Sequence, residues 1–345
     1  MRAAFEIGGM KIAAGTQALV DLPVARLSNH TPVTLPVRVI HGQKNGPTLF
    51  VSAALHGDEI LGVEVIRRLI NTPGLKALKG TLLCVPIVNV FGFLSKSRYL
   101  PDGRDLNRVF PGFPGGSLAA ELAFLFMEEI AKRSDFGIDL HSGSNNRSNL
   151  PQLRVDLVSN ELRELAETFG APVIVQSSLR EGSLRKAARE AGLEVIVYEA
   201  GEALRLDELS VRGGVRGILH VMHKLGMLGP RHANRSQHKP VFAKSSKWVR
   251  APDGGIFRAL KGLGESIAAG DTIGGITNPY EGTDIPVIAE VDGIIIGKTN
   301  VSVVNRADAL FHIAKVPRPG PAQGKIDEIA TALGEDPIFD EDEIV

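Results

Sequence analysis

The sequence predicts an α/β protein with a doubly wound, mostly parallel sheet, followed by a smaller all-β domain. Continuous apolar runs at 48–56 and 81–89 are typical of strands covered on both faces. Apolar residues at helical spacing follow the first run and recur at 118–131, so strands and helices alternate. From 248 to 314, short β-type runs bounded by glycines replace this pattern and indicate a sandwich of hairpins.

Weaker patterns complete the first domain, which we expect over residues 1–228. It begins with a β-rich segment over 1–46 and ends with a helix over 211–228. Further strands are expected at 136–143, 155–158, 173–176 and 195–198, and further helices at 161–169 and 184–191. A polar linker is predicted at 229–239, the all-β domain at 240–316, and a mobile or loosely docked acidic tail at 317–345.

The amino-acid composition limits the classes of binding partner that we expect. The chain has 39 basic and 39 acidic residues among its 345, so no basic field attracts nucleic acid or an anionic membrane. We therefore expect small-molecule partners, with the oligomeric state left open and a homo-oligomer possible. The single cysteine, Cys84, lies in an apolar run and is expected in the core. Without a secretory or membrane-spanning pattern, the cytoplasm is the predicted compartment.

A candidate metal site begins where the first apolar run ends. His56 and Glu59 are placed to enter the crevice at the carboxyl edge of the sheet, and His141 ends a second predicted strand. Two histidines and a carboxylate are the protein ligands of many catalytic zinc sites. On its own, a His-x-x-Glu pair is weak evidence for a metal site, because the first turn of a helix favours acidic residues. His141, a second histidine at a strand end, strengthens the prediction of a metal site.

Two other segments carry polar residues suited to a site. The long loop at 91–116 contains Arg98, Arg104 and the pair Asn107-Arg108, a set that favours anion recognition over a merely solvated loop. Glu199 ends a predicted strand and is placed to act as general base and acid on a metal-activated water. Its alternative role is to cap the helical segment that follows residue 204.

Taken in order, these motifs resemble the succinylglutamate desuccinylase and aspartoacylase family, which is related to the zinc carboxypeptidases. The resemblance rests on His56-x-x-Glu59, Asp105-Leu106-Asn107-Arg108, Asp139-Leu140-His141-Ser142 and Glu199-Ala200-Gly201. It implies one zinc ion per chain, held by His56, Glu59 and His141, and a catalytic carboxylate at Glu199.

The resemblance also implies roles for residues on the substrate side. Asn107 and Arg108 correspond to a pair that binds a substrate carboxylate, and Arg98 to the arginine that stabilises the oxyanion. The spacer between Arg98 and Asn107 is longer here than in aspartoacylase, so Arg104 is a second candidate. Arg185, in the segment 182–185, resembles a further substrate-side arginine.

The function implied is a zinc-dependent amidohydrolase that removes an acetyl or succinyl group from a small N-acyl amino acid. A zinc metallocarboxypeptidase acting on short peptides would use the same residues and is the alternative. A carrier role for the β-rich domain is less favoured, because the hairpin at 290–293 has no lysine at its tip.

Overall fold

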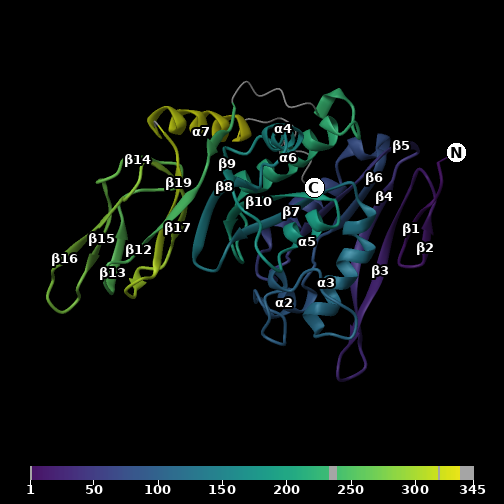
Figure 1. Cartoon of the computed structure of the whole chain (residues 1–345), viewed down its shortest axis with the longest axis horizontal. Coiled ribbons are helices and arrows are strands. Elements are labelled where there is room, and N and C mark those ends of the chain that lie inside the picture. The colour runs from purple at the N-terminus through teal and green to yellow at the C-terminus, as the bar shows by residue number, and fades with distance from the viewer. Residues whose placement is uncertain (1, 233–238, 318, 335–345) are drawn as a thin grey trace.

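One long sheet runs through the molecule and carries helices on both faces (Figure 1). The computed structural model describes residues 2–232, 239–317 and 319–334. The path of neighbouring strands is β12-β19-β17-β8-β10-β7-β5-β6-β4-β3, and β9, β11 and β14 pair beside it. In chain order these strands are β3 (Thr16–Arg26), β4 (Pro32–His41), β5 (Lys44–Ala53), β6 (Lys79–Val85), β7 (Phe136–Gly143), β8 (Arg147–Val155), β9 (Val173–Gln176), β10 (Glu194–Glu202), β11 (Val241–Ala243), β12 (Ser246–Arg250), β14 (Ser266–Ile267), β17 (Gly293–Thr299) and β19 (Ala309–Lys315).

The centre of the sheet is parallel. β6, β5, β7 and β10 all run in one direction, and β4 and β8 continue the sheet antiparallel to β6 and β10. β7 is buried along its whole length, and apart from Asp139 and His141 its residues are apolar or small. Cys84 lies buried in β6, where burial raises the pKa of its thiol to about 12. The predicted parallel centre and the core position of Cys84 are confirmed; the likeness to carboxypeptidases stays a prediction.

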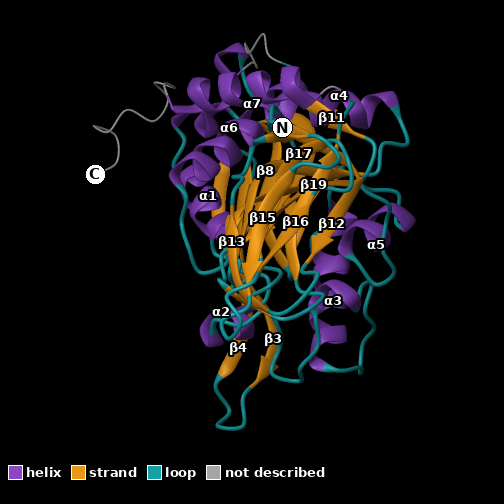
Figure 2. Cartoon of the chain, turned by 90° about the vertical axis from the view of Figure 1, so that its left-hand side faces the viewer, coloured by secondary structure: helices purple, strands orange, loops and turns teal. Residues whose placement is uncertain are grey.

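Helices cover the two faces of this centre. α1, α4 and α6 pack on one face around Leu61, Leu165 and Ile218, while α3 and α5 pack on the other around Phe126 and Leu184. Figure 2 shows α1 and α6 to one side of the strands and α3 and α5 to the other. The helices are α1 (Leu61–Ile70), α2 (Val90–Ser95), α3 (Leu118–Glu129), α4 (Asn160–Phe169), α5 (Leu184–Glu190), α6 (Glu208–Lys224) and α7 (Pro319–Gly334), with 3-10 turns η1 (Pro73–Ala77), η2 (Leu106–Arg108), η3 (Ala131–Arg133) and η4 (Pro230–His232).

The region after residue 240 is a β-sandwich, as the glycine-bounded runs predict. A four-stranded sheet in the order β16-β15-β13-β18 faces β17, β19 and β12. Phe257 of the first sheet meets Phe311 of the second edge-on, with 5.7 Å between ring centroids. β17 also pairs with β8, so the C-terminal strands continue the central sheet. The domain boundaries stay a prediction. The strands of the small sheet are β13 (Gly255–Ala259), β15 (Thr272–Thr277), β16 (Asp284–Ile288) and β18 (Val303–Val304).

Several predicted elements have different bounds, and for β8 and α6 the physical cause is clear. The strand expected at 155–158 is β8, which ends at Val155 and instead includes the polar residues that precede it. β8 forms because β10 and β17 supply hydrogen-bonding partners on its two sides, which local sequence does not report. The helix expected at 211–228 begins at Glu208, because the Asp207 side chain caps it by accepting from Ser210 N at 2.9 Å.

The expected loose tail is in part a docked helix. Residues 319–334 form α7, which buries Ala322, Ile326, Ile329 and Leu333. The Gln323 side chain accepts a hydrogen bond of 3.0 Å from Ser266 N of β14, fixing the helix to the C-terminal strands. The acidic residues at 335–345 lie outside the described residues.

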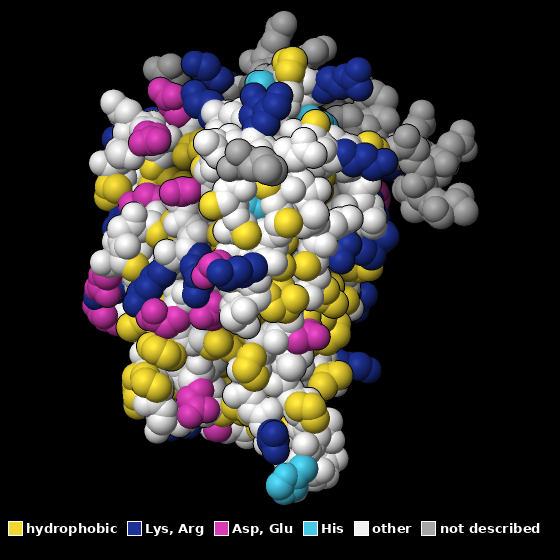
Figure 3. All heavy atoms as spheres, turned by 90° about the vertical axis from the view of Figure 1, so that its right-hand side faces the viewer, with side chains coloured by type: hydrophobic (Ala, Val, Ile, Leu, Met, Phe, Trp, Pro, Cys, Tyr) yellow, Lys and Arg dark blue, Asp and Glu magenta, His cyan; other side chains and the backbone are white. Residues whose placement is uncertain are grey.

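The surface agrees with the balanced composition. On the face that carries the hairpin of β1 (Phe5–Ile7) and β2 (Met10–Ile12), side chains of both charge signs are spread among polar and apolar ones (Figure 3). Among the described residues, no helix has the length and apolar character needed to cross a membrane.

Close packing of α1 on the sheet generates a stability prediction. A Cβ added at Gly62 would lie 2.7 Å from the Cβ atoms of Ala53 and Leu140, so the helix would have to move off β5 and β7. We expect Gly62→Ala to lower the free energy of unfolding by about 1–3 kcal/mol, measured by denaturant titration. Gly324→Ala in α7 is the matched control, because no heavy atom lies within 4 Å of its added Cβ. Equal stability of the two variants would contradict this packing.

Candidate active site

Two parallel strands bring the predicted metal ligands to one edge of the sheet. His56 and Glu59 lie in the loop between β5 and α1, and His141 lies near the carboxyl end of β7. β5 and β7 are neighbours, with Ala53 opposite Leu140, so both chains leave the sheet at the same place. Gly57 permits this loop path, because a Cβ there would lie 2.0 Å from the carbonyl carbon of Gly92 in α2.

The Glu59 carboxylate lies between the two imidazole rings. Its Oε1 is 2.8 Å from Nδ1 of His56, and its Oε2 is 2.8 Å from Nδ1 of His141. All three residues are buried, and one ligand atom from each lies within 4.8 Å of the others. Within the described part of the chain this is the one cluster of such residues that can hold a metal ion. His220 and His223 of α6 do not belong to it.

A further carboxylate faces the outer nitrogen of each ring. Nε2 of His141 is 2.7 Å from Asp139 Oδ2, and Asp139 Oδ1 accepts a hydrogen bond of 2.7 Å from Ser52 Oγ. Nε2 of His56 lies 3.3 Å from Asp105 Oδ1, an ion-pair distance without hydrogen-bond geometry. A proton held at Nε2 by a carboxylate leaves Nδ1 as the metal-binding lone pair. The residues present therefore fit a metal at the two Nδ1 atoms and Glu59.

The pKa values show how strongly these charges depend on one another. Burial alone favours the neutral form of Glu59, but His56 and His141 outweigh it and hold the pKa of this carboxyl well below its usual range. Burial likewise opposes a charge on His141, yet Asp139 and Glu59 raise the pKa of its ring well above the ordinary value. The carboxylates that favour a proton on these rings would also favour a metal cation between them.

Glu199 faces the same crevice from β10. It lies directly opposite His141 in the parallel register of β10 and β7. Asn149 Nδ2 donates to Glu199 Oε2 at 2.8 Å, and Arg154 Nε lies 3.1 Å from Oε1. The alternative role for Glu199, capping the next helix, is excluded because Asp207 caps α6. Fixed at both oxygens beside the histidine cluster, Glu199 is placed to exchange a proton with a bound substrate or water.

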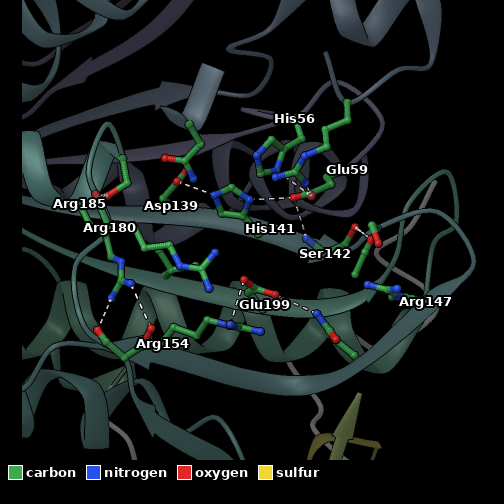
Figure 4. A pocket seen from close by; sticks show the side chains of 18 of the residues that line it. His56, Glu59, Asp139, His141, Ser142, Arg147, Arg154, Arg180, Arg185 and Glu199 are labelled. Carbon is green, nitrogen blue, oxygen red and sulfur yellow. Dashed lines mark hydrogen bonds and ion pairs between the residues drawn. The ribbon is translucent and has the colours of Figure 1, made fainter. Parts of the chain in front are cut away.

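A pocket of about 470 Å³ opens over these groups, and its lining is rich in arginine (Figure 4). Only Glu59, Asp139 and Glu199 bring negative charge to the lining. The excess of guanidinium groups favours an anionic ligand. The arginines that line the pocket are Arg98, Arg108, Arg147, Arg154, Arg180 and Arg185.

The structure distinguishes Arg98 from Arg104, the two arginines predicted to stabilise the oxyanion. Arg98 lines the pocket, with Nη1 3.3 Å from Glu59 Oε1 and Nη2 2.9 Å from Asp105 Oδ2. Arg104 does not line it; its side chain is 54% exposed and pairs with Asp102 at 3.1 Å. Arg104 therefore does not lie among the pocket residues, because its local partner holds it at the surface of the loop, and its role in the substrate site stays a prediction.

The other predicted substrate-side residues do line the pocket. The loops around Asn107 and Arg185 pack together, and Asn107 Oδ1 accepts a hydrogen bond of 3.0 Å from Leu184 N. Arg108 extends from the first loop, and Arg185 from α5. Arg185 donates to Ser177 O at 3.2 Å, and burial lowers the pKa of its guanidinium to about 10.

Five side chains that matter for the chemistry of this lining are not found by sequence reasoning. Asn149 and Arg154 hold Glu199, but they lie on β8, where polar residues and Pro151 do not predict a strand. Arg147, at the start of β8, and Arg180, in the loop after β9, carried no motif. Trp248 of β12 also lines the pocket, and its being the one tryptophan of the chain was an available signal.

Fold and pocket together define an α/β enzyme with a possible metal site at the carboxyl edge of its sheet. The family model described as the succinylglutamate desuccinylase/aspartoacylase catalytic domain matches residues 45–225. The chain therefore belongs to the succinylglutamate desuccinylase/aspartoacylase family. It is an enzyme of the hydrolase class, like the deacylases it is related to.

Individual relatives agree with this assignment. The N-alpha-acetyl-L-2,4-diaminobutyric acid deacetylase of Halomonas elongata is 27% identical over 296 residues, which are 82% of this chain and 86% of the relative. A succinylglutamate desuccinylase/aspartoacylase from Rhodobacter sphaeroides superposes with a TM-score of 0.78 at 26% identity, covering 87% of this chain and 96% of that one. The product-bound ectoine utilization protein EutE (DoeB) of Ruegeria pomeroyi shares the fold, with a TM-score of 0.77 at 22% identity and coverage of 88% and 95%.

The ligand geometry generates a prediction about metal content. We expect His56→Ala and His141→Ala to lose most of the zinc bound by the wild type, because each removes one of three donors. Asp139→Asn should weaken zinc binding about 10- to 100-fold, since it removes the carboxylate that orients His141. Zinc content after dialysis, measured by mass spectrometry, tests both. His223→Gln, outside the cluster, should keep the wild-type content, and full retention in both alanine variants would refute the site.

Proposed function

We propose that this protein is a zinc-dependent deacylase that removes a small acyl group, acetyl or succinyl, from an N-acyl amino acid. The observation that carries the proposal is that the His-Glu-His cluster, Glu199 and the arginine side chains all open into one pocket of about 470 Å³. A cavity of that size buries a small ligand almost completely. The deacetylase name of the Halomonas elongata relative supports the same class of substrate.

Glu199 carries out proton transfer in this proposal. Zinc held by His56, Glu59 and His141 would act as a Lewis acid and lower the pKa of a water to about 7. Glu199 accepts a proton from the attacking water and later gives it to the departing amine nitrogen. Asn149 and Arg154 keep its carboxylate pointed at the pocket during both transfers.

The arginines that line the pocket bind the substrate in this proposal. Arg98 donates to the amide oxygen as negative charge develops on it. Arg108, with Asn107 beside it, holds the substrate carboxylate, and a planar guanidinium suits a bidentate contact of this kind. Arg185, fixed by Ser177, adds positive charge on the same side of the pocket. These contacts orient the amide towards Glu199.

A metallocarboxypeptidase is the alternative use of the same residues. Trp248, from the C-terminal β-sandwich, lines the pocket and adds an aromatic wall to it. A wall at this position leaves less room for a peptide that extends beyond the scissile residue. This feature favours a small N-acyl amino acid as the substrate.

Amine release from a panel of N-acetyl and N-succinyl amino acids tests the proposal, with Glu199→Gln as the critical variant. We expect the zinc-loaded wild type to hydrolyse at least one compound, and Glu199→Gln to lose about 10²- to 10⁴-fold in kcat, because an amide cannot accept the proton. The variant should keep its zinc. If it retained near-normal kcat, the base would lie elsewhere, and if the wild type cleaved C-terminal residues from peptides but no panel member, the alternative would replace the proposal.

Arg108 and Arg104 form a matched pair for the recognition step. We expect Arg108→Lys to raise KM more than it lowers kcat, since lysine keeps the charge but loses the planar fork. Arg104→Lys should leave both constants unchanged, because Arg104 pairs with Asp102 outside the pocket. Steady-state kinetics on the best panel substrate distinguish the two. Unchanged kinetics in Arg108→Lys would remove Arg108 from the carboxylate site.

A further inference from the structure

The end of α7 lies on α6 (Figure 2), and its contacts show the direction in which the chain leaves the helix. Arg216 of α6 donates to Ala332 O at 3.3 Å. Arg212, one turn earlier in α6, donates to Gly334 O at 3.3 Å. A Cβ added at Gly334 would lie 4.0 Å from Leu209, which is earlier still. Later residues of α7 thus contact earlier residues of α6, so the chain after Gly334 is directed past the first turn of α6.

Three exposed leucines lie in that direction. Leu209 is in the first turn of α6, and Leu204 and Leu206 are in the loop that joins β10 to α6. These residues are 42%, 40% and 60% exposed, respectively. Single exposed apolar residues are ordinary, but three leucines within six positions form a local apolar surface that a binding segment can cover. We call Leu204, Leu206 and Leu209 the leucine patch.

The loop of the leucine patch supports the segments that carry the candidate metal ligands. Leu204 N donates to Asp58 O at 2.8 Å, in the loop between β5 and α1, and Ala203 N donates to Gly143 O at 2.8 Å, at the end of β7. Leu204 has a φ of +58°, which is uncommon for leucine, so its backbone depends on such contacts. A segment bound over the patch would therefore limit the motion of backbone next to the candidate metal site.

The charges around the patch favour an acidic segment. Arg212 and Arg216 lie on the face of α6 that receives the end of α7, and the Arg205 side chain, within the loop, is 74% exposed. The neighbouring carboxylates of Glu202 and Glu208 each lie near one of these arginines, at 3.6 Å from Arg205 and 2.8 Å from Arg212. A segment rich in carboxylates can therefore approach the patch without meeting a net negative surface.

The sequence that follows Gly334 has the composition that this surface requires. Residues 335–345 read Glu-Asp-Pro-Ile-Phe-Asp-Glu-Asp-Glu-Ile-Val, so six acidic residues surround the apolar pair Ile338-Phe339. Four extended residues span about 13–14 Å, which allows this pair to reach from Gly334 to the loop before α6. Apolar residues flanked by carboxylates match a leucine patch flanked by arginines.

We propose that the leucine patch is an intramolecular docking surface for residues 335–345, with the Ile338-Phe339 pair against Leu206 and acidic side chains beside Arg205. The bound segment covers the patch and stabilises the loop between β10 and α6. None of the patch residues lines the pocket, so this inference does not depend on the proposed deacylase function. A second copy of the chain is the other candidate occupant, and the experiment distinguishes the two.

Disulfide trapping in the full chain tests the contact. Leu206→Cys combined with Phe339→Cys should form an intramolecular disulfide under mild oxidation, and the native Cys84 is buried and does not compete. Leu19→Cys with Phe339→Cys is the matched control, because Leu19 is an exposed leucine of β3, at the end of the sheet path, and this pair should react about tenfold more slowly or less. Peptide mapping by mass spectrometry identifies the bonds. Equal rates in the two pairs would overturn the proposal, and so would a bond between two chains at position 206, which would assign the patch to a second copy.

Hydrogen exchange tests the consequence for the loop. Phe339→Asp should raise the exchange rate of the amides at 204–209 by about tenfold and leave that of β6 unchanged, because only the covering segment is lost. Tyr280→Asp makes the same kind of substitution at a residue that is 96% exposed, and it should match the wild type throughout. Equal exchange at 204–209 in the wild type and Phe339→Asp would overturn the proposal, as would an increase that Tyr280→Asp reproduces.

Discussion

The buried carboxylate of Glu59 is the constraint on which the rest of the site depends. A carboxylate removed from water is costly unless it is paired, and Glu59 is only 2% exposed. His56, His141 and Arg98 surround it, and Ser142 N donates to it at 3.1 Å. This pairing requires the ends of β5 and β7 to be adjacent, so the parallel centre of the sheet and the charge cluster stabilise one another. A bound metal would fit the same balance of charge.

β8 connects this cluster to the C-terminal part of the chain. It pairs with β10 on one side and β17 on the other, and its side chains fix both oxygens of Glu199. Gly297 of β17 lies opposite Asn149, where an added Cβ would come within 3.0 Å of the Asn149 side-chain oxygen. The position of Glu199 therefore depends on β8 (Arg147–Val155) and β17 (Gly293–Thr299), which are far apart in the sequence. The C-terminal sandwich takes part in the pocket both through this pairing and through Trp248.

The charge of the pocket differs from the charge of the chain as a whole. The chain has equal numbers of acidic and basic residues, yet six arginines and three carboxylates line the pocket. Some of these arginines pair with carboxylates of the protein, and others have N–H donors that are available to a ligand. This division is a property of contacts, since all six are the same residue type. It explains how a chain with no net charge presents a strongly cationic binding site.

The sequence by itself determined the parallel centre of the sheet, the burial of Cys84, and the placement of His56, His141 and Glu199 near the carboxyl edge of that sheet. Continuous apolar runs report burial on both faces, and a polar residue that ends such a run must lie at the carboxyl edge. Only the tertiary structure decided the course of β8, whose segment contains Pro151 and alternating polar residues and is held by distant partners. It also decided that Arg98 lines the pocket while Arg104 pairs with Asp102, and that residues 319–334 dock as a helix. The physical reason is that periodicity records which residues are buried, whereas the partner of each polar side chain depends on segments that only folding brings together.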